Sequence, residues 1–96
     1  MPIKGLDEFT RKIKELEKAA AALDGDLTSV GFDPSDPQSI ELAIQQMEDE
    51  VDKRVGSLAS NEIVSEMASQ LKERARAAIL EKAERARVAG EGDHDA

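Results

Sequence analysis

Hydrophobic residues recur along the chain in three stretches that have the spacing of α-helices. In the first stretch they lie alternately three and four residues apart, which is the spacing of a heptad repeat and predicts a helix over residues 6–23. Such a seam is typical of a helix that packs along a second helix. Gly25 follows and is a suitable residue to end the helix. We call this set the α-heptad seam: Leu6, Phe9, Ile13, Leu16, Ala20 and Leu23.

The second stretch predicts a helix over residues 37–55. Asp36 is a preferred N-cap, and Pro37 suits the first helical position because its missing N–H needs no partner there. Gly56 and Ser57 loosen the chain at the far end. The apolar residues of this stretch fall on one stripe, made of Ile40, Ile44, Met47, Val51, Val55 and Leu58.

A third helix is expected over residues 61–88, with Ser60 or Asn61 as its N-cap. After Leu80 its apolar face is thin, so the last turns lack an anchor unless another chain covers them. Residues 90–96 are charged and poor in hydrophobic residues, which predicts a disordered acidic tail. The stripe of this helix contains Ile63, Val64, Met67, Leu71, Ala75, Ala78 and Ile79, followed by Ala83, Ala86 and Val88.

These elements predict an all-α fold, with a single helical domain over residues 1–89 and one short extended segment at 27–32. Val30 and Phe32 share a face of that segment, and the aspartates and prolines after it end it. Two interpretations stay open. The segment is a loop that fills the gap between helices, or it pairs antiparallel with the same segment of a second copy.

Composition favours self-association. The 96 residues include two Phe and no Trp, Tyr or Cys, so the core is thin and aliphatic, and a chain this small is marginally stable alone. No apolar run is long enough to cross a membrane, and no signal peptide is recognisable. We therefore expect a cytoplasmic protein that forms a homo-oligomer, with a dimer as the first candidate.

The net charge of −8 is concentrated in the middle of the chain, where residues 24–58 hold nine acidic and two basic side chains. This distribution disfavours nucleic-acid binding, which needs a net positive face. It suits an acidic inhibitor, such as an antitoxin, immunity protein or nucleic-acid mimic, that binds a basic protein through residues 24–52. It also suits contact between two copies, in which Arg74 and Arg76 of one meet Glu48, Asp49 and Glu50 of the other.

Residues for catalysis or cofactor binding are not recognisable. The single histidine is His94, near the end of the expected tail, and there is no cysteine to act as a nucleophile. The stretch "DGDLTSVGFDPSD" resembles a calcium-binding loop only at its start, because Ser29 replaces the required glycine and Ser35 the bidentate glutamate. We expect no catalytic residues, no cofactor and no metal, and therefore no enzymatic activity.

The stretch "IKGLDEFTRKIKELEKAAAALDG", residues 3–25, resembles the opening helix of small prophage and mobile-element proteins. It is similar to the start of tailed-phage tail-completion proteins, and the likeness is carried by Gly5, Leu6, Asp7 and Glu8. Those proteins continue into a sheet-bearing region that residues 37–88 do not provide. The resemblance implies a mobile-element origin and carries over no functional residues.

The leading hypothesis is thus a non-enzymatic, self-associating helical interaction protein of phage or mobile-element type. Its candidate interaction residues belong to four groups. They are taken from the α-heptad seam (Leu6, Phe9, Ile13, Leu16 and Leu23), the extended segment (Val30 and Phe32), the acidic block of residues 24–52 (Glu48, Asp49 and Glu50) and the third helix (Arg74 and Arg76).

Overall fold

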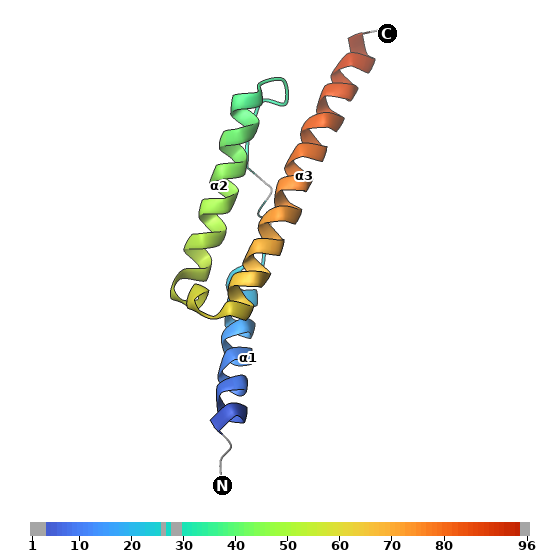
Figure 1. Ribbon diagram of the computed structural model, residues 1–96. Coiled ribbons are helices and arrows are strands. Elements are labelled where there is room, and N and C mark those ends of the chain that lie inside the picture. Colours follow the sequence, from blue (N-terminus) through green and yellow to red (C-terminus); the bar gives the residue numbers. More distant parts are fainter. Residues whose placement is uncertain (1–3, 26, 28–29, 95–96) are drawn as a thin grey trace.

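The structure is a computed structural model that describes residues 4–25, 27 and 30–94. Its elements are α1 (Lys4–Ala22), α2 (Pro37–Val55), the 3-10 helix η1 (Gly56–Ser60) and α3 (Glu62–His94). α2 and α3 form an antiparallel hairpin joined by η1, and α1 lies beside the first part of α3 and runs in the same direction (Figure 1). No strand occurs among the residues described, so the predicted all-α class is confirmed.

Both ends of α2 lie where the sequence places them. The Asp36 carboxylate accepts a hydrogen bond from the backbone N–H of Gln38 at 3.0 Å, and Pro37 is the first helical residue. At the other end Gly56 has φ of 54°, a conformation that disfavours side chains, and its N–H donates to the carbonyl of Asp52. These two residues therefore define the length of α2.

α3 is longer than expected, because it continues to His94 instead of ending at residue 88. Residues 90–94, which the sequence assigns to a disordered tail, have helical backbone. No proline follows Pro37, and each residue added to an existing helix gains a hydrogen bond to the preceding turn without a new nucleation cost. Residues 95 and 96 of the expected tail lie outside the described residues.

The hydrophobic core lies between α2 and α3. Met47 and Val51 of α2 pack with Val64 and Ile79 of α3, and all four side chains are fully buried. The predicted stripe of α2 is buried along its middle, with Ile40 and Leu58 half-buried at its ends. On α3 the inner row is Ala75, Ile79 and Ala83, spaced four residues apart, which leaves Ala78 exposed.

α1 contributes only its second half to this core. Ala19 of α1 and Leu23, directly after α1, are buried, whereas Leu6 and Phe9 are 59% and 57% exposed. α1 extends past η1, where the hairpin ends, so within the described part of the chain its first turns have no neighbouring helix (Figure 1). The α-heptad seam is therefore covered within the chain only toward its C-terminal end.

Asn61 joins α1 to the hairpin. Its side-chain oxygen accepts hydrogen bonds from the backbone N–H groups of Ile63 at 2.9 Å and Val64 at 3.4 Å, which caps α3. Its side-chain nitrogen donates to the carbonyl of Lys12 at 3.1 Å and to the Glu15 carboxylate at 2.9 Å. One buried amide thus satisfies the start of α3 and fixes the position of α1.

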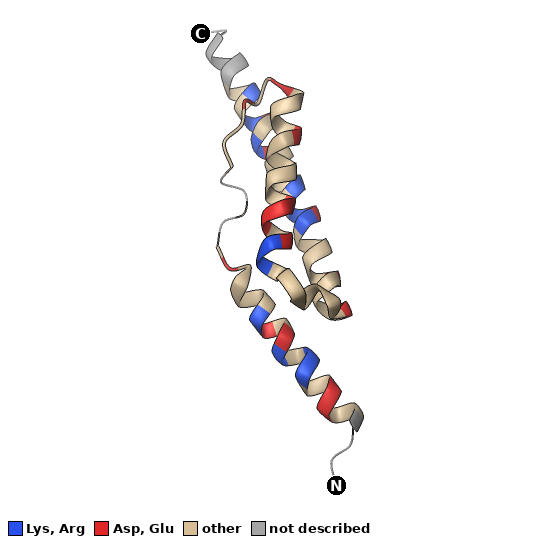
Figure 2. Cartoon of the chain, turned by 90° about the vertical axis from the view of Figure 1, so that its left-hand side faces the viewer, with Lys and Arg blue, Asp and Glu red and all other residues tan. Residues whose placement is uncertain are grey.

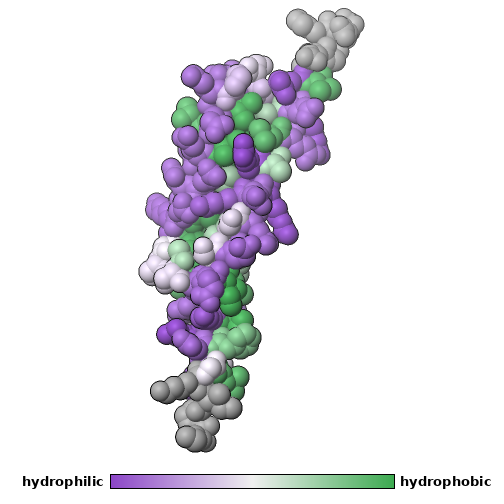
Figure 3. Space-filling model, viewed as in Figure 1, coloured by the Kyte–Doolittle hydropathy of each residue, from purple (hydrophilic) through white to green (hydrophobic). Residues whose placement is uncertain are grey.

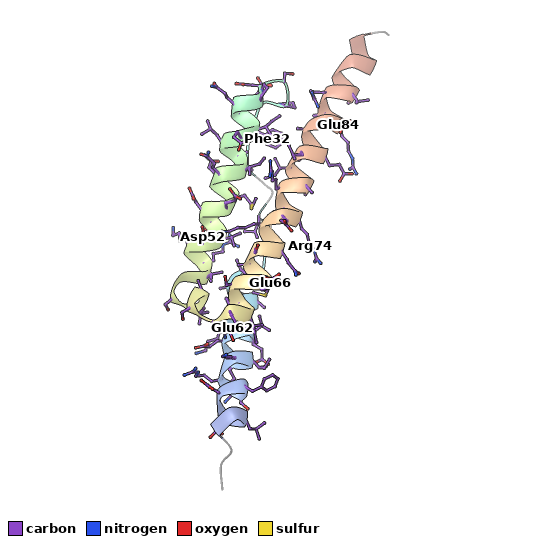
Figure 4. All side chains as sticks on the ribbon, viewed as in Figure 1. Phe32, Asp52, Glu62, Glu66, Arg74 and Glu84 are labelled. Carbon is purple, nitrogen blue, oxygen red and sulfur yellow. The ribbon has the colours of Figure 1, made fainter. Side chains whose placement is uncertain are left out.

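The extended segment lies over the hairpin. Leu27 is buried, and Val30 and Phe32 are half-buried and packed against the core, with Phe32 labelled in Figure 4. Residues 28 and 29 lie outside the described residues. These contacts are the ones expected of a loop that fills the gap between helices, while pairing with a second copy stays a hypothesis.

Replacing Asn61 should weaken the junction of α1 and α3. We expect Asn61→Ala to lower the free energy of unfolding by about 2 kcal/mol, because it removes a helix cap and leaves the carbonyl of Lys12 without this donor. Urea unfolding followed by far-ultraviolet circular dichroism measures the change. Ser60→Ala is the matched control, since this exposed hydroxyl donates to the Ser57 carbonyl within η1 and its loss should cost less than about 0.5 kcal/mol.

Phe32→Ala separates the two interpretations of the extended segment. If Phe32 fills the gap in its own chain, the variant should lose about 1–2 kcal/mol of unfolding free energy, below the roughly 3–5 kcal/mol typical of a fully buried Phe. Its self-association should not change. Weaker association with unchanged monomer stability would instead support pairing of this segment between two copies.

Candidate functional site

An apolar groove of about 720 Å³ lies between α1 and the start of α3. Its floor is formed by Ile13, Leu16 and Ala20 from α1 and by Ile63 and Met67 from α3. Ala19 of α1 and Val64 of α3 are fully buried. The groove residues lie beside these positions on the two helices and remain partly accessible. Its polar edge consists of Glu17, Glu62, Glu66 and Gln70.

Hydrophobic surface continues beyond both ends of this groove. Toward the C-terminus of α1, a second hollow is lined by Leu23, Leu71 and Arg74, and it shares Ala20, Met67 and Gln70 with the first. Toward the N-terminus, Phe9 and Leu6 extend the α-heptad seam past the end of the hairpin. Figure 3 shows hydrophobic surface along one side of the α1 end of the molecule. We call this continuous surface the α1–α3 groove.

The ion pair of Lys12 and Glu62 joins α1 to the first turn of α3, next to Asn61. The Lys12 ammonium donates to the Glu62 carboxylate at 2.5 Å. This hydrogen bond raises the pKa of Lys12 and lowers the pKa of Glu62, and the attraction between the opposite charges adds to both shifts. Because Glu62 also suits the N-terminal turn of α3, the pair holds α1 at the positive end of that helix.

The structure brings part of the predicted interaction set together. Ile13 and Leu16 line the first hollow, and Arg74 and the mostly buried Leu23 line the second. Leu6 and Phe9 are exposed on α1 before the first hollow. Val30 and Phe32 belong to the loop over the hairpin, and exposed Arg76 does not line the groove.

The acidic block lies mainly on α2, away from the groove. Glu50 pairs with Arg54 at 3.3 Å, and Asp52 pairs with Lys72 of α3 at 2.5 Å. Glu48 is half-buried and Asp49 is exposed. Figure 2 shows acidic and basic residues side by side along the helices. Two acids of the block are therefore engaged within the chain.

Apart from Arg74, the α3 side of the groove is absent from the predicted interaction residues. Glu62, Glu66, Gln70 and Arg74 are spaced four residues apart, so they form one row on α3, and Glu62, Glu66 and Arg74 are labelled along it in Figure 4. Ile63 and Met67 lie beside this row. The repeat is visible in the sequence, but the sequence does not show that α1 lies next to it.

Within the described ranges, the acidic, histidine and cysteine side chains form no group suited to hold a metal ion. The same part of the chain contains no helix that is long and apolar enough to cross a membrane. The lining residues make the groove an apolar surface with charged edges, which is an arrangement suited to binding another protein surface.

Comparison with known proteins places the chain in a family. The model of the YuaX family matches residues 3–90. The chain belongs to the YuaX family. It is similar to the uncharacterized protein YuaX of Escherichia coli (strain K12), with 42% identity over 93 residues that cover 97% of this chain and 96% of the relative. No solved structure matches it.

The ion pair makes the Glu62 carboxyl group measurable by titration. We expect carbon-detected NMR to place the pKa of Glu62 below its ordinary value, and we expect Lys12→Met to raise it toward that value. A carboxyl with a lowered pKa in the folded state stabilises the fold above its unfolded pKa, and this contribution is lost as pH falls through the folded pKa. Stability at acid pH should therefore depend less on pH in Lys12→Met. An unchanged Glu62 titration in that variant would show that the pair does not form in solution.

Proposed function

We propose that this YuaX-family protein is a non-enzymatic helical interaction protein that forms a homodimer through the α1–α3 groove. The observation that carries the proposal is the exposed half of the α-heptad seam. Leu6 and Phe9 are more than half exposed, and Phe9 lies one helical turn before Ile13 of the apolar floor. Adjacent exposed hydrophobic residues of this kind mark surfaces that are covered in an assembly.

The surface of the monomer supports the same proposal. The molecule measures 74 × 19 × 16 Å, and its radius of gyration is 18.3 Å, compared with about 12.5 Å for a compact domain of this length. It exposes 6978 Å², whereas a compact protein of 10.4 kDa exposes about 5,400 Å². A standard interface buries about 800 Å² on each partner, so the excess surface is sufficient for one.

A second copy is the occupant that this surface fits best. The seam has heptad spacing, which packs side by side with another seam of the same spacing. The edge of the groove carries both acidic and basic residues, and a self-complementary patch needs both. A purely acidic edge would instead favour a basic partner.

Other parts of the proposal rest on the sequence. A phage or mobile-element setting is supported by the resemblance of residues 3–25, and a cytoplasmic location by the absence of cysteine. We assign the protein no catalytic role and no cofactor. The acidic inhibitor described above is the competing hypothesis, and it would bind a basic partner through residues 24–52.

Removing the exposed part of the seam should weaken the dimer. We expect the wild-type protein to sediment as a dimer at micromolar concentration and Leu6→Gln/Phe9→Gln to weaken association at least tenfold. The reason is that burying each such side chain contributes about 1.5–3 kcal/mol. Glutamine preserves helix propensity, and both residues are exposed in the monomer, so the circular dichroism spectrum should be unchanged.

Leu42→Gln is the matched control, because Leu42 is 58% exposed on α2 and does not line the groove. It should dimerise like the wild type. A wild-type protein that remains monomeric at these concentrations would refute the proposal. A dimer weakened only by Leu42→Gln would place the interface on α2.

A further inference from the structure

The α3 row of Glu66, Gln70 and Arg74 has an acidic residue at one end and a basic residue at the other. Two copies of this row that run in opposite directions therefore have complementary charges. Glu66 and Arg74 lie four residues before and after Gln70, and all three are exposed on the edge of the groove. If two such rows meet antiparallel at Gln70, Glu66 of each copy lies opposite Arg74 of the other. The pairing then contains two ion pairs related by symmetry, with the two Gln70 amides between them.

Resting on the proposed dimer, we infer that two copies pair antiparallel through the α1–α3 groove, about a two-fold axis at Gln70. The acidic end of the groove favours this orientation. Glu17, Glu62 and Glu66 cluster there, and a parallel pairing would bring both clusters together. In the antiparallel pairing the two Glu62–Glu66 ends lie about 18 Å apart along the helix, which exceeds the screening length of about 8 Å at physiological salt.

The same arrangement covers the exposed apolar residues at both ends of the molecule. Leu80 and Val88 are 44% and 60% exposed, and they follow Glu62 and Gln70 by 18 residues, which is five helical turns. They therefore lie on the face of α3 that forms the groove edge. α1 begins at one end of the molecule and α3 finishes at the other (Figure 1).

An antiparallel two-fold axis consequently brings Leu6 and Phe9 of one copy beside the Leu80–Val88 face of the other. Glu84, labelled in Figure 4, lies on that face between Leu80 and Val88. The projecting ends of the two copies then cover each other, and the assembly closes as a dimer without an open end for further addition.

The neighbouring polar groups are compatible with the two ion pairs. Gln70 donates to one oxygen of Glu66 at 3.3 Å, and the second carboxylate oxygen remains able to accept from an arginine. Asp24 lines the groove near Arg74, and Glu17 lines it near Glu66, so each ion pair has one acidic neighbour. These neighbours are the same for both ion pairs, so the complementary charges come from Glu66 and Arg74 themselves.

Charge exchange at these two positions tests the orientation. Glu66→Lys and Arg74→Glu should each weaken the dimer about tenfold in sedimentation experiments, because each replaces two attractive contacts by two repulsive ones. The double variant Glu66→Lys/Arg74→Glu restores opposite charges across the axis and should return to within about threefold of the wild type.

Arg76→Glu is the matched control for Arg74→Glu. It makes the same change in net charge, but Arg76 lies about 200° around the helix from Arg74 and outside the groove, so the dimer should be unaffected. A double variant as weak as the single ones would overturn the inferred orientation while leaving the dimer itself in place.

A disulfide measures the position of the axis directly, since the chain has no cysteine. Gln70→Cys should cross-link rapidly on mild oxidation, because each Gln70 faces its own copy across the two-fold axis. Ser65→Cys, exposed about 140° around α3 from Gln70, should remain monomeric on a denaturing gel. Equal cross-linking of the two variants would overturn the inference. A wild-type protein that does not dimerise would instead refute the proposed function.

Discussion

The structure depends on the packing of α2 against α3. The largest fully buried side chains among the described residues come from these two helices, and the remaining elements are placed against that pair. A hairpin of two helices buries one side of each helix and leaves an open angle on either side of the contact. The loop with Phe32 and the second half of α1 occupy parts of this surface. The small core leaves little apolar surface to hold more of α1, which explains why its first turns project past the hairpin.

Local sequence signals were sufficient to predict the helices and the capping residues. Asp36, Pro37 and Gly56 act through their immediate neighbours, so their roles can be read without knowledge of the fold. The length of α3 was underestimated because glycine and charge near its end favour disorder, and they do not prevent a helix already formed from continuing. Asn61 was identified as a possible cap, but its contacts with Lys12 and Glu15 join residues distant in sequence.

The groove shows a similar division. The α-heptad seam was recognised from its spacing, and its residues do lie at the apolar surface. The contribution of Ile63 and Met67 depends on the rotation of α3 that the hairpin imposes, and no local pattern determines this rotation. The acidic block shows the converse. It is a strong feature of the sequence, yet Glu50 and Asp52 find partners on Arg54 and Lys72, which reduces the charge that α2 can offer to another protein.

Because α3 is uninterrupted, the residues that face the core and the residues that face the groove keep a fixed angle to one another along the helix. Because successive residues are separated by about 100° around the axis, one inserted or deleted residue between Gln70 and Ile79 would rotate every later side chain by that angle. Ile79 and Ala83 would leave the core at the same time as Leu80 and Val88 left the groove face. Related chains that keep this architecture should therefore tolerate changes of length in the loop before α2 far better than within this part of α3.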